Sequence, residues 1–260
     1  MGKLGVIMST HNGSKKVLDA IDSILEQSYK DFKIIVCDDA STDNTLKLLN
    51  EKYRNNKKIT IVRNNQSRGL SYALNLCLEQ CKDCEYIARM DDDDYSYKNR
   101  LEEQILFLEK NEDISFVGCN VDIFDGDSIV NTRKMIEFPK KTDFLWNSPF
   151  IHPTVVFRYN ALKKSDFYRV SKETLRGQDY DLFMRMYSKG FYGANIQKTL
   201  FRYTENNSTR KKRTLGVRLG ECKVRIIGFY KMNILLVAFP FVLKPLIAYV
   251  KDKIELREEM

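Results

Sequence analysis

Four consecutive carboxylates, Asp91 to Asp94, form the densest group of chemically reactive side chains in the sequence. Like charges a few ångströms apart raise one another's pKa values unless a positive group intervenes. A divalent cation meets this need, since Mg²⁺ and Mn²⁺ prefer carboxylate oxygens and leave positions open for substrate phosphates. Successive side chains of an extended segment point in opposite directions, so only some of the four can face one ion. The alternative is a solvated acidic turn.

Two further polar clusters follow predicted strands. Ser9-Thr10-His11-Asn12 comes after the first apolar run, and Asp38-Asp39-Ala40-Ser41 comes after the second. Asn, Asp and Ser also favour turns and helix caps, so either cluster alone could serve that local purpose. In a parallel α/β sheet, however, ligands bind outside the carboxyl ends of the strands. Three polar clusters at these ends, the acidic run being the third, indicate one ligand crevice.

The elements that position these clusters follow from the hydrophobic pattern. Short β-rich runs alternate with helical periodicity in the first half of the chain, which predicts an α/β fold with a mostly parallel sheet flanked by helices. The predicted strands cover residues 3–9, 32–37, 59–63, 85–90 and 114–124. The predicted helices lie near residues 17–25, 46–53, 70–81 and 101–108.

The pattern loosens after residue 124. It predicts a turn at 125–128, a strand at 129–137, a helical stretch near 139–147, a β-rich run at 153–158 and a helix at 179–189. Asp179 therefore lies at a helix start. A helix N-terminus stabilises a carboxylate and keeps it ionised at neutral pH, which suits a general base. The alternative is that Asp179 only caps the helix.

The six cysteines indicate a reducing compartment. No secretory signal is visible at the N-terminus, so we expect free thiols in a cytosolic protein. Cys81-x-x-Cys84 could be a metal or redox site, but no second pair and no nearby histidine completes a zinc set. Cys77 and Cys81 also fall on a helical apolar stripe, which favours core packing.

The basic excess belongs to the C-terminal tail. From Lys198 onward the chain carries 14 basic and 6 acidic residues, so this segment accounts for the whole net charge of +8. The tail is helical in pattern from Leu215 to Val250. Its apolar run from Ile234 to Leu243 has 10 residues, whereas a bilayer span needs about 20.

Such a tail suits the surface of a membrane rather than its interior. Basic residues lie just upstream of the apolar run, which is typical of a helix pair on an anionic membrane face. These residues are Arg210, Lys211, Lys212, Arg213, Arg218, Lys223 and Arg225. The alternative is a core helix that faces a protein partner.

Together the motifs resemble those of the family 2 glycosyltransferases of the GT-A fold, over roughly residues 3–208. The resemblance is carried by five segments, which are Ile7-Met8-Ser9-Thr10-His11-Asn12, Ile34 to Asp43, Ala88-Arg89-Met90-Asp91-Asp92-Asp93-Asp94, His152-Pro153-Thr154 and Gly177-Gln178-Asp179-Tyr180-Asp181. It implies a Rossmann-like sheet, a nucleoside-diphosphate-sugar donor, usually a UDP-sugar, and transfer with inversion at the anomeric carbon.

The resemblance also implies roles for the donor-side residues. The nucleotide-sugar would be held by Ser9, His11, Asn12, Asp39, Arg68, Asp91 and Asp92. Within this set, Asp39 would accept a hydrogen bond from the uracil and Asp91 would meet the ribose side. Asp93, with Asp91, would bind the Mn²⁺ or Mg²⁺ that bridges the diphosphate.

On the acceptor side, Asp179 matches the catalytic base that takes the proton from the acceptor hydroxyl. Two positions depart from the family pattern: Gln178 stands where Glu is frequent, and Thr204 replaces a histidine that closes over the diphosphate or metal. Arg202 remains a candidate phosphate contact. His152 is placed near the acceptor by the resemblance, and a purely structural histidine is the alternative.

The resemblance and the tail together predict a setting. We expect residues 1–208 to form the transferase domain, with a nucleotide-binding half at 1–124 and an acceptor-binding half at 125–208, and residues 209–260 to form a basic amphipathic extension. The acceptor would be a saccharide on a lipid-linked diphosphate, used in bacterial O-antigen or capsule assembly. The protein would lie on the cytoplasmic face of the cell membrane.

Two other protein classes share parts of the pattern. A sugar nucleotidyltransferase normally carries a glycine-rich, basic phosphate loop after its first strand, where this chain has only Asn12-Gly13-Ser14-Lys15-Lys16. A nucleic-acid-binding protein would use the basic tail. Because apolar helices interleave with that tail and no recognised nucleic-acid module accompanies it, we expect no nucleic-acid partner.

Overall fold

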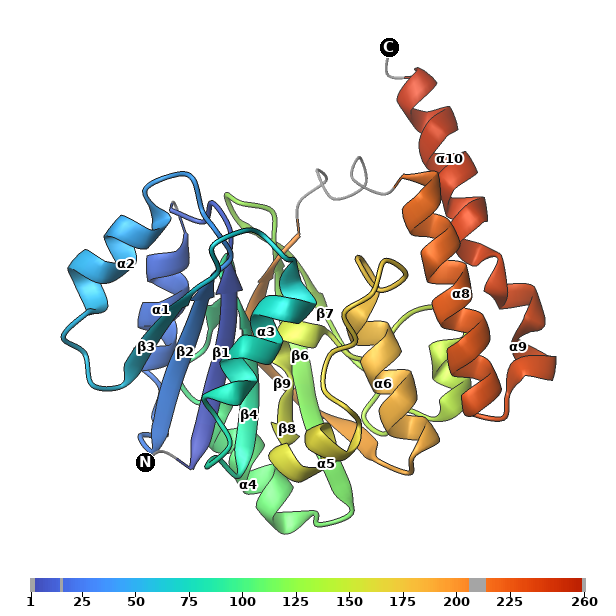
Figure 1. Ribbon diagram of the computed structural model, residues 1–260. Helices are drawn as coiled ribbons and strands as arrows, with labels where there is room; N and C mark the ends of the chain where they lie inside the picture. Colours follow the sequence, from blue (N-terminus) through green and yellow to red (C-terminus); the bar gives the residue numbers. More distant parts are fainter. Residues whose placement is uncertain (1–2, 15, 206–213, 259–260) are drawn as a thin grey trace.

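In the described part of the chain, nine strands form one sheet. The computed structural model describes residues 3–14, 16–205 and 214–258 (Figure 1). The strand order is β3-β2-β1-β4-β8-β6-β9-β5, and β7 pairs with β6 beside this path. The strands are β1 (Leu4–Thr10), β2 (Phe32–Asp38), β3 (Ile59–Arg63), β4 (Tyr86–Asp91), β5 (Tyr95–Ser96), β6 (Ile114–Phe124), β7 (Ile129–Arg133), β8 (Val156–Arg158) and β9 (Tyr192–Thr204).

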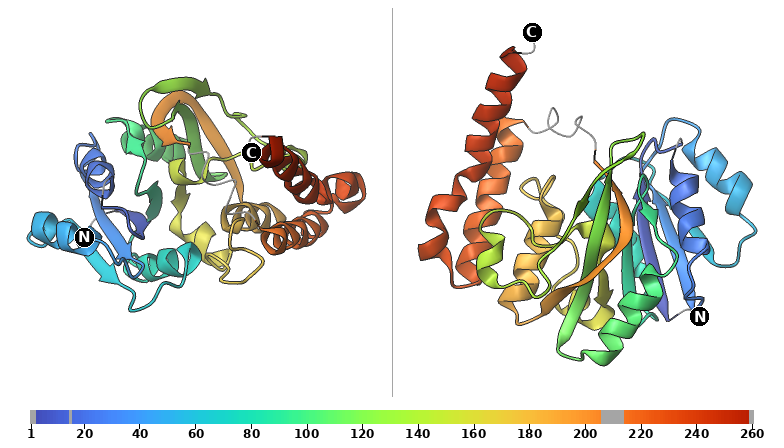
Figure 2. Two further views of the ribbon diagram at one scale, coloured as in Figure 1. Left: turned by 90° about the horizontal axis from the view of Figure 1, so that it is seen from above. Right: turned by 180° about the vertical axis from the view of Figure 1, so that it is seen from behind.

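Most strands run in one direction, as the sequence predicts. β1 pairs in parallel with β2 and β4, and β2 pairs in parallel with β3. β8 is antiparallel to both β4 and β6, so those two strands are parallel to each other, and β9 is parallel to β6. The strands of opposite direction are β5, β7 and β8. The long strands β6 and β9 curve strongly (Figure 2).

Helices cover both faces of this sheet. They are α1 (Val17–Leu25), α2 (Thr45–Tyr53), α3 (Leu70–Glu79), α4 (Arg100–Lys110), α5 (Tyr159–Lys164), α6 (Gln178–Ser188), α8 (Leu215–Lys231), α9 (Leu235–Val242) and α10 (Lys244–Glu258). Two short 3-10 turns, η1 (Lys141–Phe144) and η2 (His152–Thr154), lie in the second half.

The two faces follow from the alternation of side chains along each strand. On β1, Val6 and Met8 belong to one core cluster with residues of α1, α2 and α4, whereas Ile7 belongs to a second cluster with residues of α3 and α6. Burial of each such side chain contributes about 1.5–3 kcal/mol. This two-sided burial fixes the carboxyl ends of β1, β2 and β4 at one edge of the sheet.

The second half differs from the sequence prediction in detail. The predicted strand at 129–137 ends at Arg133, because the backbone N–H of Met135 donates to the side chain of Asn120 at 2.7 Å instead of joining the ladder. The predicted helical stretch at 139–147 contains only η1. Strand β9, at 13 residues, was not predicted at all.

The tail helices pack against the second half of the sheet domain. α8 contacts α6, α9 and α10, and all three tail helices stand together at one side of the molecule (Figure 1). Val224, Phe229 and Met232 share one core cluster with Phe183 of α6. No helix among the described residues is long and apolar enough to cross a bilayer. The predicted domain boundary at 208–209 lies outside the described residues.

Two of the tail arginines that the sequence assigns to a membrane face are instead buried. Arg218 forms ion pairs with Glu221 at 3.2 Å and Asp252 at 2.7 Å. Arg225 donates to backbone carbonyl oxygens of the loop after η1. Burial with these partners removes both from the surface, which corrects that part of the prediction. The basic run at 210–213 lies outside the described residues.

We predict that Gly228→Val destabilises the protein by about 1–3 kcal/mol, because an added Cβ would lie 2.3 Å from the Met184 sulfur. Gly216→Val on the same helix is the matched control, since the nearest atom to its added Cβ is 3.9 Å away. The measurement is the free energy of unfolding in urea. Equal losses in the two variants would contradict tight packing of α8 on α6.

Candidate active site

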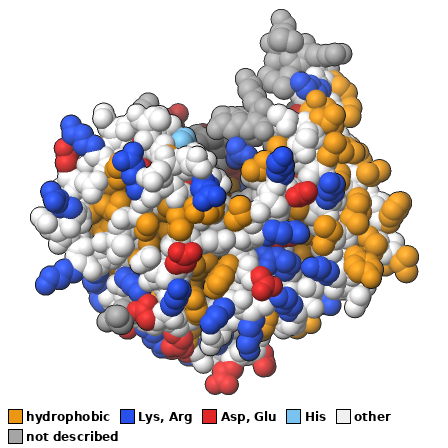
Figure 3. Space-filling model, viewed as in Figure 1, with side chains coloured by type: hydrophobic (Ala, Val, Ile, Leu, Met, Phe, Trp, Pro, Cys, Tyr) orange, Lys and Arg blue, Asp and Glu red, His pale blue; other side chains and the backbone are white. Residues whose placement is uncertain are grey.

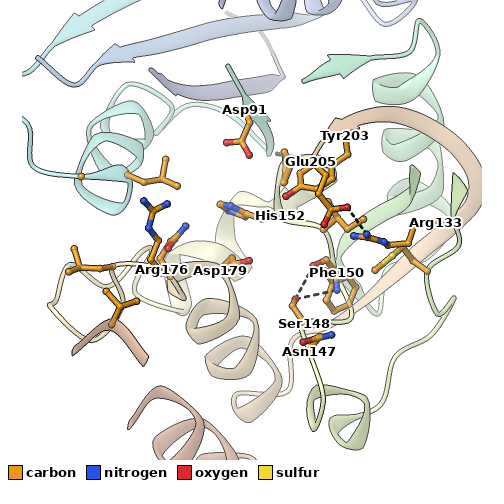
Figure 4. A pocket seen from close by; sticks show the side chains of 18 residues that line it. Asp91, Arg133, Asn147, Ser148, Phe150, His152, Arg176, Asp179, Tyr203 and Glu205 are labelled. Carbon is orange, nitrogen blue, oxygen red and sulfur yellow. Dashed lines mark hydrogen bonds and ion pairs between the residues drawn. The ribbon is translucent and has the colours of Figure 1, made fainter. Parts of the chain in front are cut away.

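A cavity of about 1060 Å³ opens where the first half of the sheet meets the loops of the second half. Asp91 lines it from the end of β4, His152 from η2, and Gln178 and Asp179 from the start of α6. Asp91 and Asp179 lie on opposite sides of His152 in this cavity (Figure 4). The structure therefore gathers residues that are nearly ninety positions apart in the sequence.

The first two acids of the run are held by different strands. Asp91 pairs with the guanidinium of Arg89, whose side chain is fully buried and keeps two nitrogens without a hydrogen-bond partner. Asp92 accepts a hydrogen bond from the hydroxyl of Thr10 at 2.6 Å. Burial raises the pKa of Asp92 to about 6, although the Thr10 hydroxyl opposes this shift. Gly13 lies so close that a Cβ there would be 2.5 Å from the Asp92 carboxylate.

The last two acids are tied to β9 through one residue. Thr204 donates its hydroxyl to the backbone oxygen of Asp93 at 2.5 Å and its N–H to Asp94 at 2.7 Å. The threonine at the family's histidine position thus anchors the acidic run. Asp94 is buried, whereas Asp93 is partly exposed with Lys16 as a cation at 3.9 Å. Burial and the charge of Asp91 raise the pKa of Asp93.

Asp39 organises a neighbouring loop. Its carboxylate accepts from the side chains of Asn64 and Ser67 and from the backbone N–H groups of Arg68 and Gly69, at 2.6–3.0 Å. Burial acts to raise the pKa of Asp39, but these four donors outweigh it and lower the pKa. Each of the two oxygens already accepts two hydrogen bonds from the protein. The predicted contact with uracil would have to be made in addition to these four.

The other predicted nucleotide residues surround Asp39. His11 donates from Nδ1 to the Asp39 carbonyl oxygen at 2.8 Å. Asn12, in a left-handed conformation, accepts at Oδ1 from backbone N–H groups of the loop that follows β2. Ser9 lies at the end of β1, beside the ends of β2 and β4. Arg68 stacks over the ring of Tyr72 at 4.0 Å. The structure brings these residues to one edge of the sheet.

Asp179 is the second residue of α6, as the helix prediction implies. Helix α6 begins at Gln178, and Gly177 before it supplies no side-chain cap. The exposed N–H groups of a first helical turn favour a carboxylate. The Oε1 atom of Gln178 is buried and has no hydrogen-bond partner within the described residues. A substrate hydroxyl would satisfy it.

His152 combines a buried structural contact with a position on the cavity wall. It is buried and shares a hydrogen bond of 2.7 Å with the hydroxyl of Tyr168, yet it lines the cavity. Burial, together with the nearby charge of Arg89, holds the pKa of His152 well below its usual range. The imidazole is therefore neutral at pH 7.

Arg202 does not reach the cavity. Its guanidinium lies over the rings of Phe124 at 4.4 Å and Tyr95 at 4.9 Å. Because side chains alternate along β9, the next residue, Tyr203, lines the cavity in its place. The lining of this cavity therefore gives no support to Arg202 as a phosphate contact, which stays a prediction.

Three charged residues of the cavity were missed from the sequence. Arg133 and Glu205 form an ion pair of 2.9 Å across its wall (Figure 4). No motif singles out either residue, since they meet only through the pairing of β6 with β7 and β9. Arg176 also lines the cavity. Arg176 directly precedes Gly177-Gln178-Asp179, and this position in the sequence could have indicated that it lies near the cavity.

We predict that His152→Gln reduces acid destabilisation. A histidine with a depressed folded-state pKa binds its proton more readily in the unfolded chain, so stability is full above pH 6.5 and falls below it. Between pH 7.5 and 5.5 the wild type should lose about 1 kcal/mol more unfolding free energy than the variant. Denaturant titration at both pH values measures this difference, and parallel losses would contradict a buried neutral histidine.

Comparisons with known proteins identify the family. Residues 5–171 match the model described as Glycosyl transferase family 2. EpsE of Bacillus subtilis (strain 168) is 32% identical over 246 residues, which cover 94% of this chain and 88% of that protein. The Escherichia coli enzyme named UDP-Glc:alpha-D-GlcNAc-diphosphoundecaprenol beta-1,3-glucosyltransferase WfaP is 28% identical over 204 residues, or 75% of this chain and 74% of that enzyme.

The solved structures extend the comparison to the fold. The crystal structure of Staphylococcus aureus TarS 1–349 in complex with UDP-GlcNAc superposes with a TM-score of 0.71 at 20% identity, over 90% of this chain and 71% of that one. This likeness shows that the two chains share a fold. The chain belongs to glycosyltransferase family 2 and has the GT-A fold.

Proposed function

We propose that this glycosyltransferase moves a sugar from a UDP-sugar to a hydroxyl of a lipid-linked saccharide, with inversion, in the assembly of a bacterial surface polysaccharide. The observation that supports the proposal is that Asp91, which we assign to the donor, and Asp179, which we assign to the acceptor, line one cavity on opposite sides of His152. The UDP-GlcNAc bound to TarS and the substrates in the name of WfaP support this donor and acceptor class.

The nucleotide belongs at the edge formed by β1 and β2. Ser9, His11 and Arg68 present polar groups there. Asn12 and Asp39 hold the surrounding loops in place through their own hydrogen bonds. We assign the first three residues to direct contacts with the nucleotide and the other two to the shape of its site.

A divalent cation fits the acidic run. Asp91 and Asp93 offer carboxylate oxygens, the ligands preferred by Mn²⁺ and Mg²⁺, and their mutual repulsion favours a bound cation. No cluster of three His, Cys, Asp or Glu able to hold a metal occurs in the described ranges, so the remaining ligands would come from the donor diphosphate and water. When bound, the ion would stabilise negative charge on the departing diphosphate.

Asp179 acts as the catalytic base. Its carboxylate takes the proton of the acceptor hydroxyl as that oxygen attacks the anomeric carbon. The attack comes from the face opposite the diphosphate, so the new glycosidic bond forms as the bond to UDP breaks. Gln178 and the neutral His152 position the acceptor through hydrogen bonds.

We predict that Asp179→Asn lowers sugar transfer by about 10²–10⁴-fold while UDP-sugar binding stays within twofold of wild type, because only the base is lost. Asp93→Ala should instead weaken metal-dependent binding of the UDP-sugar. The measurements are UDP release and calorimetric titration with UDP-sugars in Mn²⁺ or Mg²⁺.

Asp127→Asn, in the exposed turn between β6 and β7, is the control. Full activity of both site variants without metal would refute the assignment. Release of pyrophosphate instead of UDP would indicate a nucleotidyltransferase.

The tail offers an apolar surface suited to a membrane. Leu236 is 96% exposed on α9. Also exposed are Val237 and Phe239 on α9, Leu243 between the two helices, and Ile247 on α10. Figure 3 shows hydrophobic side chains gathered over these helices. We propose that this surface lies on the cytoplasmic face of the membrane, where a lipid-linked acceptor is found.

We predict that Leu236→Ser/Phe239→Ser reduces co-sedimentation with phosphatidylglycerol vesicles at least tenfold. Both side chains are exposed, so the unfolding free energy should change by less than about 1 kcal/mol. Leu106→Ser, at an exposed position of α4 far from the tail, serves as the control. Undiminished vesicle binding by the double variant would exclude this surface as the membrane contact.

A further inference from the structure

A second cavity of about 290 Å³ adjoins the main one. It lies between the start of α6, the loop at 147–148, and the tail helices α8 and α10. Asp179 and Arg176 line both cavities. The smaller cavity therefore continues the active site from the catalytic base toward the tail.

Cations dominate the lining of this smaller cavity. Its four cations are Arg176 before α6, Arg218 and Arg225 on α8, and Lys244 on α10, against the two carboxylates of Asp179 and Glu221. The charge of Arg218 is compensated by its two ion pairs in the tail. The other three cations do not form an ion pair with a carboxylate anywhere in the described ranges.

Arg225 and Lys244 are held in place by neutral partners. The guanidinium of Arg225 donates to the carbonyl oxygens of Leu145 and Trp146, both at 2.9 Å. Lys244 donates to the Trp146 carbonyl oxygen and to Oδ1 of Asn147, the latter at 2.7 Å. Carbonyl oxygens orient these cations without neutralising them. Burial and the charge of Arg225 lower the pKa of Lys244.

Arg176 is the third of these cations and lines the cavity from the loop before α6. It is exposed and forms no hydrogen bond or ion pair with any described residue. Its side chain points into the space beside Asp179 (Figure 4). Three cations that form no ion pair with a described residue, around a small space, favour an anion with several oxygens and more than one charge. Arginine and lysine are the usual partners of phosphate in such sites.

We propose that the smaller cavity binds the phosphate groups of the acceptor, and that these groups are attached to the same sugar that provides the attacking hydroxyl. This inference rests on the proposed function. Because Asp179 lines both cavities, one acceptor molecule can place a hydroxyl at its carboxylate and a phosphate in the smaller cavity. The tail helices are then part of the acceptor site.

The test is calorimetric titration of the full chain with inorganic pyrophosphate in EDTA, so that no metal contributes. UDP is present at a concentration that a prior titration in EDTA shows to fill the donor site. The wild type should bind pyrophosphate. Arg176→Gln should weaken binding at least threefold, and Arg176→Gln/Lys244→Gln at least tenfold. Because Arg176 is exposed and unpartnered among the described residues, its single variant tests the cavity without altering the fold.

A charge-matched control is Lys47→Gln/Arg54→Gln, which removes two exposed cations from α2 on the far side of the molecule (Figure 1). It should bind pyrophosphate like the wild type. Failure of the wild type to bind, or equal affinities of the wild type and the Arg176→Gln/Lys244→Gln variant, would overturn the proposal.

Phosphatidylglycerol vesicles separate an acceptor phosphate from a lipid headgroup. The two cavity variants should sediment with vesicles as the wild type does. Loss of vesicle binding with unchanged pyrophosphate affinity would assign the cavity to membrane lipid and reject an acceptor site. If UDP-sugar binding and UDP release fail while pyrophosphate binding behaves as expected, the proposed function is wrong and the anion site stands.

Discussion

The mutual repulsion of Asp91 to Asp94 is the constraint on which the site depends. Three partners hold the four residues of the run. Arg89 on β4 pairs with Asp91, Thr10 on β1 donates to Asp92, and Thr204 at the end of β9 donates to both Asp93 and Asp94. The four acidic residues can be adjacent because groups on β4, β1 and β9 bind them at different atoms, which offsets the repulsion between their charges. The run therefore joins β1 and β4 in the first half of the sheet to β9 in the second half.

The first half of the fold could be predicted because its strands are buried on both faces. Such strands appear as apolar runs, and the helices between them as apolar stripes, so β1 to β4 were found at nearly their true bounds. Strand β9 was missed because polar residues interrupt it. Asn195 is buried there only because its amide donates to the carbonyl oxygens of Ile136 and Pro149, contacts that no periodicity reveals.

For the candidate site, the sequence predicts where residues lie on strands and helices, but it does not predict which groups their side chains contact. Motif spacing placed Asp91 and Asp179 correctly at a strand end and a helix start. Motif spacing could not show that the Asp39 carboxylate accepts hydrogen bonds from the loop at 64–69. Nor could it show that the Arg202 guanidinium lies over Phe124 and outside the cavity lining. The count of charges likewise led to the prediction that Arg225 lies on the surface. The sequence does not reveal that backbone carbonyl oxygens accept hydrogen bonds from its buried guanidinium.

The central claim is that donor and base face each other across one cavity. A crystal structure with UDP and Mn²⁺ tests it most directly. The account predicts that the diphosphate lies against Asp91 and Asp93 with the metal between them, and that Asp179 lies across the cavity with open space for an acceptor. A diphosphate bound away from the acidic run, beside Lys244 in the smaller cavity, would contradict it.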